Sequence, residues 1–300
     1  MKNIIKYALC AALAAGSFNA NASLSDGRLY IIGEALSYGY SLDAAQALLA
    51  TSENPEVFTG TIYLKGNESF KFMENAEWGG TEYGASTSEP VSGQIILASG
   101  KNDSGYNKIT VADAGNYYMV IDTKNLTATI EKSAYQAAPI EYCSLFLVGG
   151  NTPGGWSVDN GTPLYQSVET PYTYSNKDAY ITSDGSFKIA RTIKGGGTFD
   201  AKYWFYRDAN DSGKISTDNT NDLQWSVAGD GNYAVSVNTV DNSISINKVV
   251  DETTGITTII TDASNDGNAT YFNLQGVKVE HPASGIYIKV TNNSISKVRL

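Results

Sequence analysis

The chain contains two copies of one sequence module, and this repeat constrains its fold more than any other feature. Three blocks of the first copy recur in the same order: LYIIGEALSYGYSLDAAQAL (29–48) as LFLVGGNTPGGWSVDNGTPL (145–164), residues 114–132 as 230–248, and SFKFM (69–73) as SFKIA (186–190). The offset between the copies is 116 residues for the first two blocks and 117 for the third. Such regularity indicates a tandem duplication, so we expect two modules of the same architecture.

Each copy has the residue pattern of short strands joined by turns. Apolar and polar residues alternate in EVFTGTIYLKG (56–66) and ESFKFMEN (68–75), and residues 117–131 predict a hairpin. One segment differs, because the spacing of apolar residues in SLDAAQALLATS (41–52) predicts a short helix capped by Ser41. The fold expected is all-β, with two tandem immunoglobulin-like β-sandwich modules.

The expected organisation has four parts: a signal peptide at 1–22, modules at 23–134 and 139–250, and a linker with a C-terminal β segment at 251–300. The last part contains three expected strands, YFNLQGVKV (271–279), GIYIKVT (285–291) and SKVRL (296–300). The core of the first module is expected to contain alternating apolar residues, namely Ile31, Phe58, Ile62, Phe70, Phe72, Val120 and Ile130.

The N-terminus predicts export. A basic start (MKNIIK) precedes a short apolar run and a small-residue pattern that ends at Ala22, as in a secretory signal peptide. The residues before Cys10 do not form a lipoprotein box, so we expect a soluble-type signal and a location at the cell surface, outer membrane or outside the cell. Removal of the signal leaves Cys143, which is expected to be buried and to form no intramolecular disulfide.

Charge and motifs argue against several functions. The net charge of −10 disfavours nucleic acid as a partner. The lone histidine, His281, has no nucleophile motif beside it, and metal patterns such as HExxH are absent from the sequence, so we expect no enzyme, cofactor or metal. A glycoside hydrolase stays open, because acidic residues are plentiful. DANDSGKISTDN (208–219) departs from a calcium loop at Ser212 and Asn219 and predicts an Asx-rich turn.

Loop aromatics beside polar residues are the candidate ligand contacts. A sugar ring has an apolar face and a rim of hydroxyls, which suit an aromatic platform with hydrogen-bonding neighbours. The candidates of the first copy are Trp78, Tyr83, Lys71 and Asn75, with Glu77 nearby; those of the second are Trp156, Trp204, Tyr203, Lys188 and Arg191, with Asn160 and Arg207 nearby. Trp225 is expected to be structural. Trp156 aligns with Tyr40, and an aromatic residue at the same position in both copies favours a packing role. Trp78 and Trp204 lie in the middle segment, where the two copies differ most, so they are the preferred ligand contacts.

These motifs resemble a known family. The opening blocks, the following F-K-F/I, the G-N-Y hairpins and FKFMENAEWGGTEYGA (70–85) resemble the starch-binding domains of the SusE and SusF outer-membrane proteins of Bacteroidetes, over residues 27–250. The resemblance implies non-catalytic β-sandwich domains that bind α-glucan, with other outer-membrane glycan-uptake proteins as possible partners. The C-terminal stretch from Phe272 is similar to the sorting tails of type IX secretion.

The expected function is therefore that of an exported, non-catalytic carbohydrate-binding protein of the cell envelope, with α-glucan as its ligand. The alternative is a surface structural or adhesive protein that uses the same modules for protein contacts. The alternative predicts buried tryptophans and no exposed aromatic face.

Overall fold

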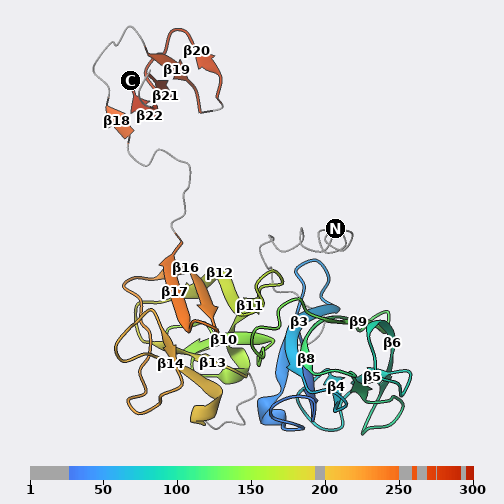
Figure 1. The fold of residues 1–300 in the computed structure, drawn as a ribbon. Coiled ribbons are helices and arrows are strands. Elements are labelled where there is room, and N and C mark those ends of the chain that lie inside the picture. The colour runs from blue at the N-terminus through green and yellow to red at the C-terminus, as the bar shows by residue number, and fades with distance from the viewer. Residues whose placement is uncertain (1–26, 193–199, 250–258, 262–268, 275, 292–294) are drawn as a thin grey trace. The chain divides into compact units, whose positions relative to one another are not determined.

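A computed structural model gives the fold of the chain and describes residues 27–192, 200–249, 259–261, 269–274, 276–291 and 295–300. The expected all-β class is confirmed, since the regular elements are mostly antiparallel β-sheets with short 3-10 turns between strands (Figure 1). The chain divides into two compact units between Val249 and Val250. The predicted signal peptide lies outside the described residues, and among these residues no helix is long and apolar enough to cross a membrane.

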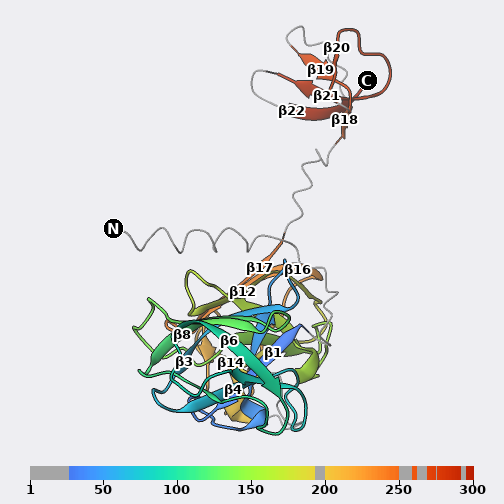
Figure 2. The same cartoon turned by 90° about the vertical axis from the view of Figure 1, so that its right-hand side faces the viewer.

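The first copy forms a nine-stranded sheet that closes on itself. Its strands are β1 (Arg28–Gly33), β2 (Gln46–Ala50), β3 (Val57–Leu64), β4 (Ser69–Met73), β5 (Glu82–Ala85), β6 (Gly93–Gly100), β7 (Ile109–Thr110), β8 (Gly115–Asp122) and β9 (Thr127–Lys132). The strand order is β1-β2-β3-β8-β9-β6-β5-β4-β7, and β1 pairs with β4 as well as β2. In Figure 2 the first copy faces the viewer, and its strands β1, β3, β4, β6 and β8 are labelled.

The core of the first copy lies inside this closed sheet. Six of the predicted core residues belong to it: Ile31, Phe58, Ile62, Phe70, Phe72 and Ile130. Val120 was predicted to belong as well, but it is only half-buried. Successive side chains of a strand point to opposite faces, and in β8 it is Met119 and Ile121 that face the core. Cys143 is buried beside the same core, as predicted.

The second copy repeats the plan with eight strands. These are β10 (Ser144–Gly149), β11 (Thr162–Gln166), β12 (Thr173–Ile181), β13 (Phe187–Ala190), β14 (Trp204–Arg207), β15 (Ile215–Ser216), β16 (Gly231–Asn238) and β17 (Ser243–Lys248). The order is β15-β14-β13-β10-β11-β12-β16-β17, so β10 lies between β11 and β13 as β1 lies between β2 and β4. Both predicted hairpins are present, as β8–β9 and β16–β17.

Two further predictions in the second copy are confirmed. Trp225 is buried and its ring stacks on Phe187 with centroids 5.9 Å apart, so Trp225 is structural. The segment 208–219 contains Asx turns: the Asp208 carboxylate accepts hydrogen bonds from the backbone N–H groups of Asn210 and Asp211. The module boundaries at 134 and 139 stay a prediction, and both sheets lie in the same compact unit.

The predicted helix at 41–52 is wrong. A 3-10 turn, η2 (Leu42–Ala44), is followed directly by strand β2. Leu48 faces the core of the first copy, whereas Ala47 and Leu49 face a second cluster on the other side of the strand. A strand buried on both faces lacks the alternation of a half-buried strand, and its apolar run then imitates a helical spacing.

The two sheets meet through a shared apolar cluster, here called the inter-sheet cluster. It contains buried residues of both copies, namely Tyr30, Ile32, Ala44, Ala45, Ala47, Leu49, Met73, Phe146, Val148, Ala190, Tyr203, Trp204 and Tyr206, with Ala76. Apolar burial of this extent favours a fixed arrangement of the two sheets over a loose tether.

The C-terminal unit is a five-stranded sheet. Its strands are β18 (Ile259–Thr261), β19 (Thr270–Phe272), β20 (Lys278–Val279), β21 (Ile286–Val290) and β22 (Ile295–Arg299), in the order β18-β22-β21-β19-β20. The strand predicted at 271–279 is instead a hairpin, β19–β20, because Gly276 adopts a left-handed φ of 78° in a turn. Strand β18 precedes the three strands that were expected in the C-terminal part, in a stretch for which no strand was predicted.

Candidate binding site

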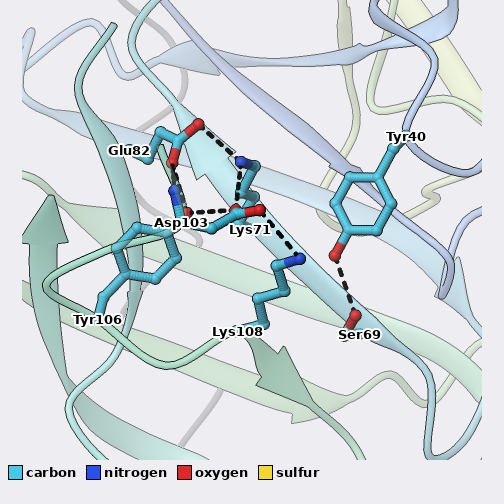
Figure 3. Close-up of polar contacts among 7 residues, drawn as sticks. All are labelled: Tyr40, Ser69, Lys71, Glu82, Asp103, Tyr106 and Lys108. Carbon is cyan, nitrogen blue, oxygen red and sulfur yellow. Dashed lines mark hydrogen bonds and ion pairs between the residues drawn. The ribbon is translucent and has the colours of Figure 1, made fainter. Parts of the chain in front are cut away.

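A buried lysine organises the outer face of β4. Alternation along this strand sends Phe70 and Phe72 into the core and Lys71 to the opposite face. Lys71 is nevertheless only 1% exposed. Its ammonium lies 2.6 Å from the Glu82 carboxylate and 2.8 Å from that of Asp103 (Figure 3). A charge removed from water needs such partners, so the three side chains form one electrostatic unit.

Tyr106 and the backbone complete this unit. The Tyr106 hydroxyl donates to Glu82 at 2.5 Å, and the backbone N–H of Asp103 donates to the same carboxylate at 3.0 Å. Asn102 and Asp103 have left-handed φ values of 52° and 57°, which non-glycine residues seldom adopt. The buried lysine and glutamate therefore hold the tight turn after β6 in its conformation.

Gly84 makes room for the Tyr106 ring. A Cβ atom at Gly84 would lie 2.3 Å from the ring carbon Cδ2 of Tyr106 and 2.2 Å from the Asn107 carbonyl oxygen. These distances are shorter than van der Waals contact. A side chain at position 84 would therefore push Tyr106 away from Glu82.

The contacts shift the ionisation of the acidic partners. The hydrogen bond from Lys71 is the main cause that lowers the pKa of Asp103 to about 2. Burial opposes ionisation of Glu82, but the hydrogen bonds from Lys71, Tyr106 and the Asp103 backbone outweigh it and lower the pKa of Glu82. Burial and the bond to Glu82 raise the pKa of the Tyr106 hydroxyl. The carboxylates are thus charged, and Tyr106 is protonated, at neutral pH.

The lowered pKa of Asp103 predicts a pH dependence of stability. The stabilisation is complete above the ordinary value of 3.8 and is lost as the pH falls through about 2. We expect Asp103→Asn to flatten the decline of the melting temperature between pH 4 and pH 2, measured by circular dichroism. Parallel declines in the wild-type protein and the variant would contradict this assignment.

Aromatic rings lie at both ends of the charged unit. Trp78 is 57% exposed, and the Lys71 ammonium lies 5.2 Å from its ring centroid. Lys108, paired with Asp103 at 3.3 Å, lies 4.7 Å from the centroid of the Tyr40 ring. We call the whole set the Lys71 cluster: Tyr40, Ser69, Lys71, Trp78, Glu82, Asp103, Tyr106 and Lys108. It joins an exposed aromatic surface to fixed donors and acceptors.

The other predicted residues of the first copy lie apart from this surface. The Tyr83 ring belongs to the core, and its hydroxyl donates to Glu74 at 2.5 Å, so it offers no open face for stacking. Asn75 is half-buried and Glu77 is exposed, in the turn that precedes Trp78.

Sequence reasoning missed six members of the cluster: Tyr40, Ser69, Glu82, Asp103, Tyr106 and Lys108. Tyr40 and Ser69 were treated only as part of the repeated blocks. The other four come from β5 and from the turn after β6, which the chain brings to Lys71 only through strand pairing. The one available signal was the polar and aromatic run KNDSGYNK (101–108).

The second copy has a related cluster around Lys188, which aligns with Lys71. Its ammonium lies 2.7 Å from Asp222 and over three aromatic rings, those of Trp204 at 4.8 Å, Tyr206 at 5.1 Å and Trp156 at 5.5 Å from the centroids. We call these five residues the Lys188 cluster. Trp204 pairs with Ala190 as Glu82 pairs with Met73, so an aromatic ring replaces the buried carboxylate of the first copy.

In the second copy, the exposures of the tryptophans favour Trp156 over Trp204, opposite to the preference drawn from the sequence, whereas the preferred Trp78 of the first copy is exposed. Trp204 is 1% exposed and lies in the inter-sheet cluster, a position that does not suit the predicted ligand contact. Trp156 is 39% exposed, although its alignment with Tyr40 favoured a buried packing role. The divergent middle of the second copy contributes Trp204 to the contact between the sheets, and this contact is invisible in the sequence of either copy alone.

Tyr203 and Arg191 are also placed at the inter-sheet contact. Tyr203 is buried in the inter-sheet cluster. The Arg191 guanidinium donates to the Tyr142 hydroxyl at 3.2 Å and lies 5.0 Å from the centroid of the Phe205 ring. The carbonyl oxygen of Arg191 accepts a hydrogen bond from the Gln46 side chain of the first copy at 3.4 Å, which places Arg191 at the contact between the sheets.

Comparisons with known proteins agree with the predicted resemblance. Residues 28–129 match the family model of SusF/SusE starch-specific CBMs, that is, carbohydrate-binding modules, which confirms the resemblance over the first copy. This is a family of binding modules, in agreement with the expectation that the chain is not an enzyme. Among solved structures, the chain is similar to SusF from Bacteroides thetaiotaomicron, at 19% identity and a TM-score of 0.25, over 75% of this chain and 48% of that one. It thus spans about half the length of SusF, and no curated protein matches it.

Proposed function

We propose that the protein binds carbohydrate without cleaving it, and that its ligand is an α-glucan of the starch type. The single observation that carries the proposal is the exposed Trp78 beside a preorganised charged network, within the segment that matches a family of starch-specific modules. The Lys71 cluster is the proposed site, and the Lys188 cluster is its counterpart in the second copy.

The chemistry of the Lys71 cluster suits a sugar. The apolar face of a glucose ring stacks on an aromatic ring, and its hydroxyls accept from ammonium groups and donate to carboxylates. Asp103 and Lys108 have side chains that are 50% and 37% exposed, so both can reach a ligand next to the rings. The buried pair Lys71–Glu82 keeps these groups in place before binding, which lowers the entropic cost of association.

The exposure of two tryptophans supports this proposal over a purely structural role. A structural or adhesive protein was expected to bury its tryptophans, and Trp204 and Trp225 are indeed buried. Trp78 and Trp156, in contrast, present their rings to solvent next to paired lysines.

Trp78→Ala is expected to weaken binding of maltoheptaose at the first site by about tenfold or more, because it removes the aromatic surface. Isothermal titration calorimetry measures the effect on the full mature chain. Tyr180→Ala is the matched control, since Tyr180 is an exposed aromatic residue on β12 outside both clusters. Equal affinities of the Trp78 variant and the control would show that the glucan binds elsewhere.

Export to the cell envelope is part of the proposal. Cleavage after Ala22 would give a mature protein that starts at Ser23, and mass spectrometry of protein purified from the cell envelope or medium tests this directly. A mature chain that retains residues 1–22 would contradict it. The role of the C-terminal unit as a sorting tail, and association with other glycan-uptake proteins, remain proposals that follow from the resemblance.

A further inference from the structure

One edge of the first copy is left open by its own strands. Strand β3 pairs with β8 along its whole length, but with β2 only at Phe58 and Thr59. Thr61 lies in the half of β3 that extends beyond this pairing, and it is only 2% exposed. Water therefore does not reach its backbone, and a buried strand edge needs partners for its N–H and carbonyl groups.

The partner at Thr61 comes from the second copy. Gln166, at the end of β11, accepts a hydrogen bond from the Thr61 N–H at 2.6 Å and donates one to the Thr61 carbonyl at 2.9 Å. Facing residues of two antiparallel strands exchange the same pair of bonds. The Gln166 carboxamide thus takes the place of a peptide group in a neighbouring strand, although the two residues are 105 positions apart in the chain.

The segment between the copies closes the rest of this edge. The Tyr63 N–H donates to the Ile140 carbonyl at 2.7 Å. Cys143 follows a few residues later and is buried in the core of the first copy. A Cβ atom at Gly60 would lie 3.4 Å from the Cys143 sulfur, so the glycine lets Cys143 pack closely against β3.

Asn116 fastens the same segment to the first copy. Its Oδ1 accepts from the Ile140 N–H at 2.9 Å. Its Nδ2 donates to the carbonyls of Tyr135 and Ala138, each at 2.7 Å. Asn116 is 1% exposed, so these bonds form away from water and fix the path of the chain toward the second copy.

The second copy closes its equivalent edge by itself. Strand β12 takes the place of β3 in the second sheet, and it bulges between Asn176 and Ala179. The Asp178 N–H donates to the Asn176 side chain at 2.9 Å, and Asp178 is exposed. Bulges and charges are common ways to protect a free strand edge. Asn232, which aligns with Asn116, is exposed, so the support runs from the second copy to the first.

We propose that the second copy is a folding partner that the first copy requires, so that the two copies unfold as one cooperative unit. Independent modules on a tether would each close their own edges and fill their own core. Here the first copy takes Gln166 into its sheet and Cys143 into its core, both from beyond its last strand. The inter-sheet cluster adds apolar burial that both copies would lose on separation.

Hydrogen exchange with mass spectrometry tests the proposal on the full mature chain, because its peptides report on each copy separately. In a urea titration of the wild-type protein, peptides of β8–β9 and of β16–β17 should lose protection at the same midpoint. Val237→Ala opens a cavity in the core of the second copy alone and should lower both midpoints together, by about 0.5 M or more. Val240→Ala is the matched control, because Val240 is 58% exposed, and it should change neither midpoint.

Gln166→Leu tests the proposed contact itself. The variant keeps a side chain of similar size but leaves the N–H and carbonyl of Thr61 buried without their partner. The midpoint of the first-copy peptides should therefore fall by about 0.5 M or more, although the change lies in the second copy.

Two results would overturn the inference. Separate midpoints for the two copies in the wild-type protein, or a first copy that does not respond to Val237→Ala, would show that the copies are independent modules. A first copy that does not respond to Gln166→Leu would show that this side chain is not what closes β3. If Gln166→Leu does not fold, the wild-type titration and the two valine variants decide between one cooperative unit and two modules.

Discussion

Lys71→Met is expected to lower the free energy of unfolding of the first unit by about 3–5 kcal/mol, because it leaves the buried Glu82 carboxylate without its cation. Lys71 and Glu82 have side chains that are 1% exposed, so water cannot replace the lost partner. The turn at Asp103 would also lose its main contact. Urea unfolding followed by fluorescence measures the change.

The double variant Lys71→Met with Glu82→Leu is the control for this effect. Apolar side chains in place of both charges remove the unpaired carboxylate, so stability should return in part even though the ion pair is absent. Equal stabilities of the single variant and the wild-type protein would show that Lys71 is not the partner that Glu82 requires.

Trp204→Ala is expected to cost about 3–5 kcal/mol of stability, as is usual for removal of a large buried aromatic side chain. Trp204 is 1% exposed in the inter-sheet cluster, so the change opens a cavity where the two copies meet. Trp156→Ala is the matched control, because Trp156 is 39% exposed and its loss should cost less than about 1 kcal/mol. Equally small losses in both variants would argue against a structural role for Trp204.

The sequence repeat predicted the strand architecture well, because strands and hairpins depend on patterns of neighbouring residues in the chain. Hairpins and half-buried strands carry an alternation of period two, and both copies show it at equivalent positions. The prediction failed at β2, where both faces are buried, and at Val120, where the alternation was assigned to the wrong face. At β2 the deciding fact was what the far side of the strand contacts, and in β8 it was which alternate set of side chains faces the core, namely Met119 and Ile121.

The candidate site was only partly predictable for a similar reason. Lys71 and Trp78 lie within eight residues of each other in the chain, so local reasoning brought them together. Asp103 and Tyr106 reach Lys71 through the pairing of β4, β5 and β6, which no short-range pattern reveals. Trp204 and Trp156 were ranked by sequence divergence, but divergence marks the contact between the sheets as readily as it marks a ligand site.

The central claim is that this chain binds α-glucan through the exposed aromatic residue of the Lys71 cluster. The most direct measurement is affinity electrophoresis of the mature protein in gels with and without starch, with Trp78→Ala and Tyr180→Ala run beside it. The account predicts that starch retards the wild-type protein and the Tyr180 variant, and that it retards the Trp78 variant less. Unchanged mobility of the wild-type protein in starch, and in gels that contain each of a broad panel of other glycans, would contradict the account.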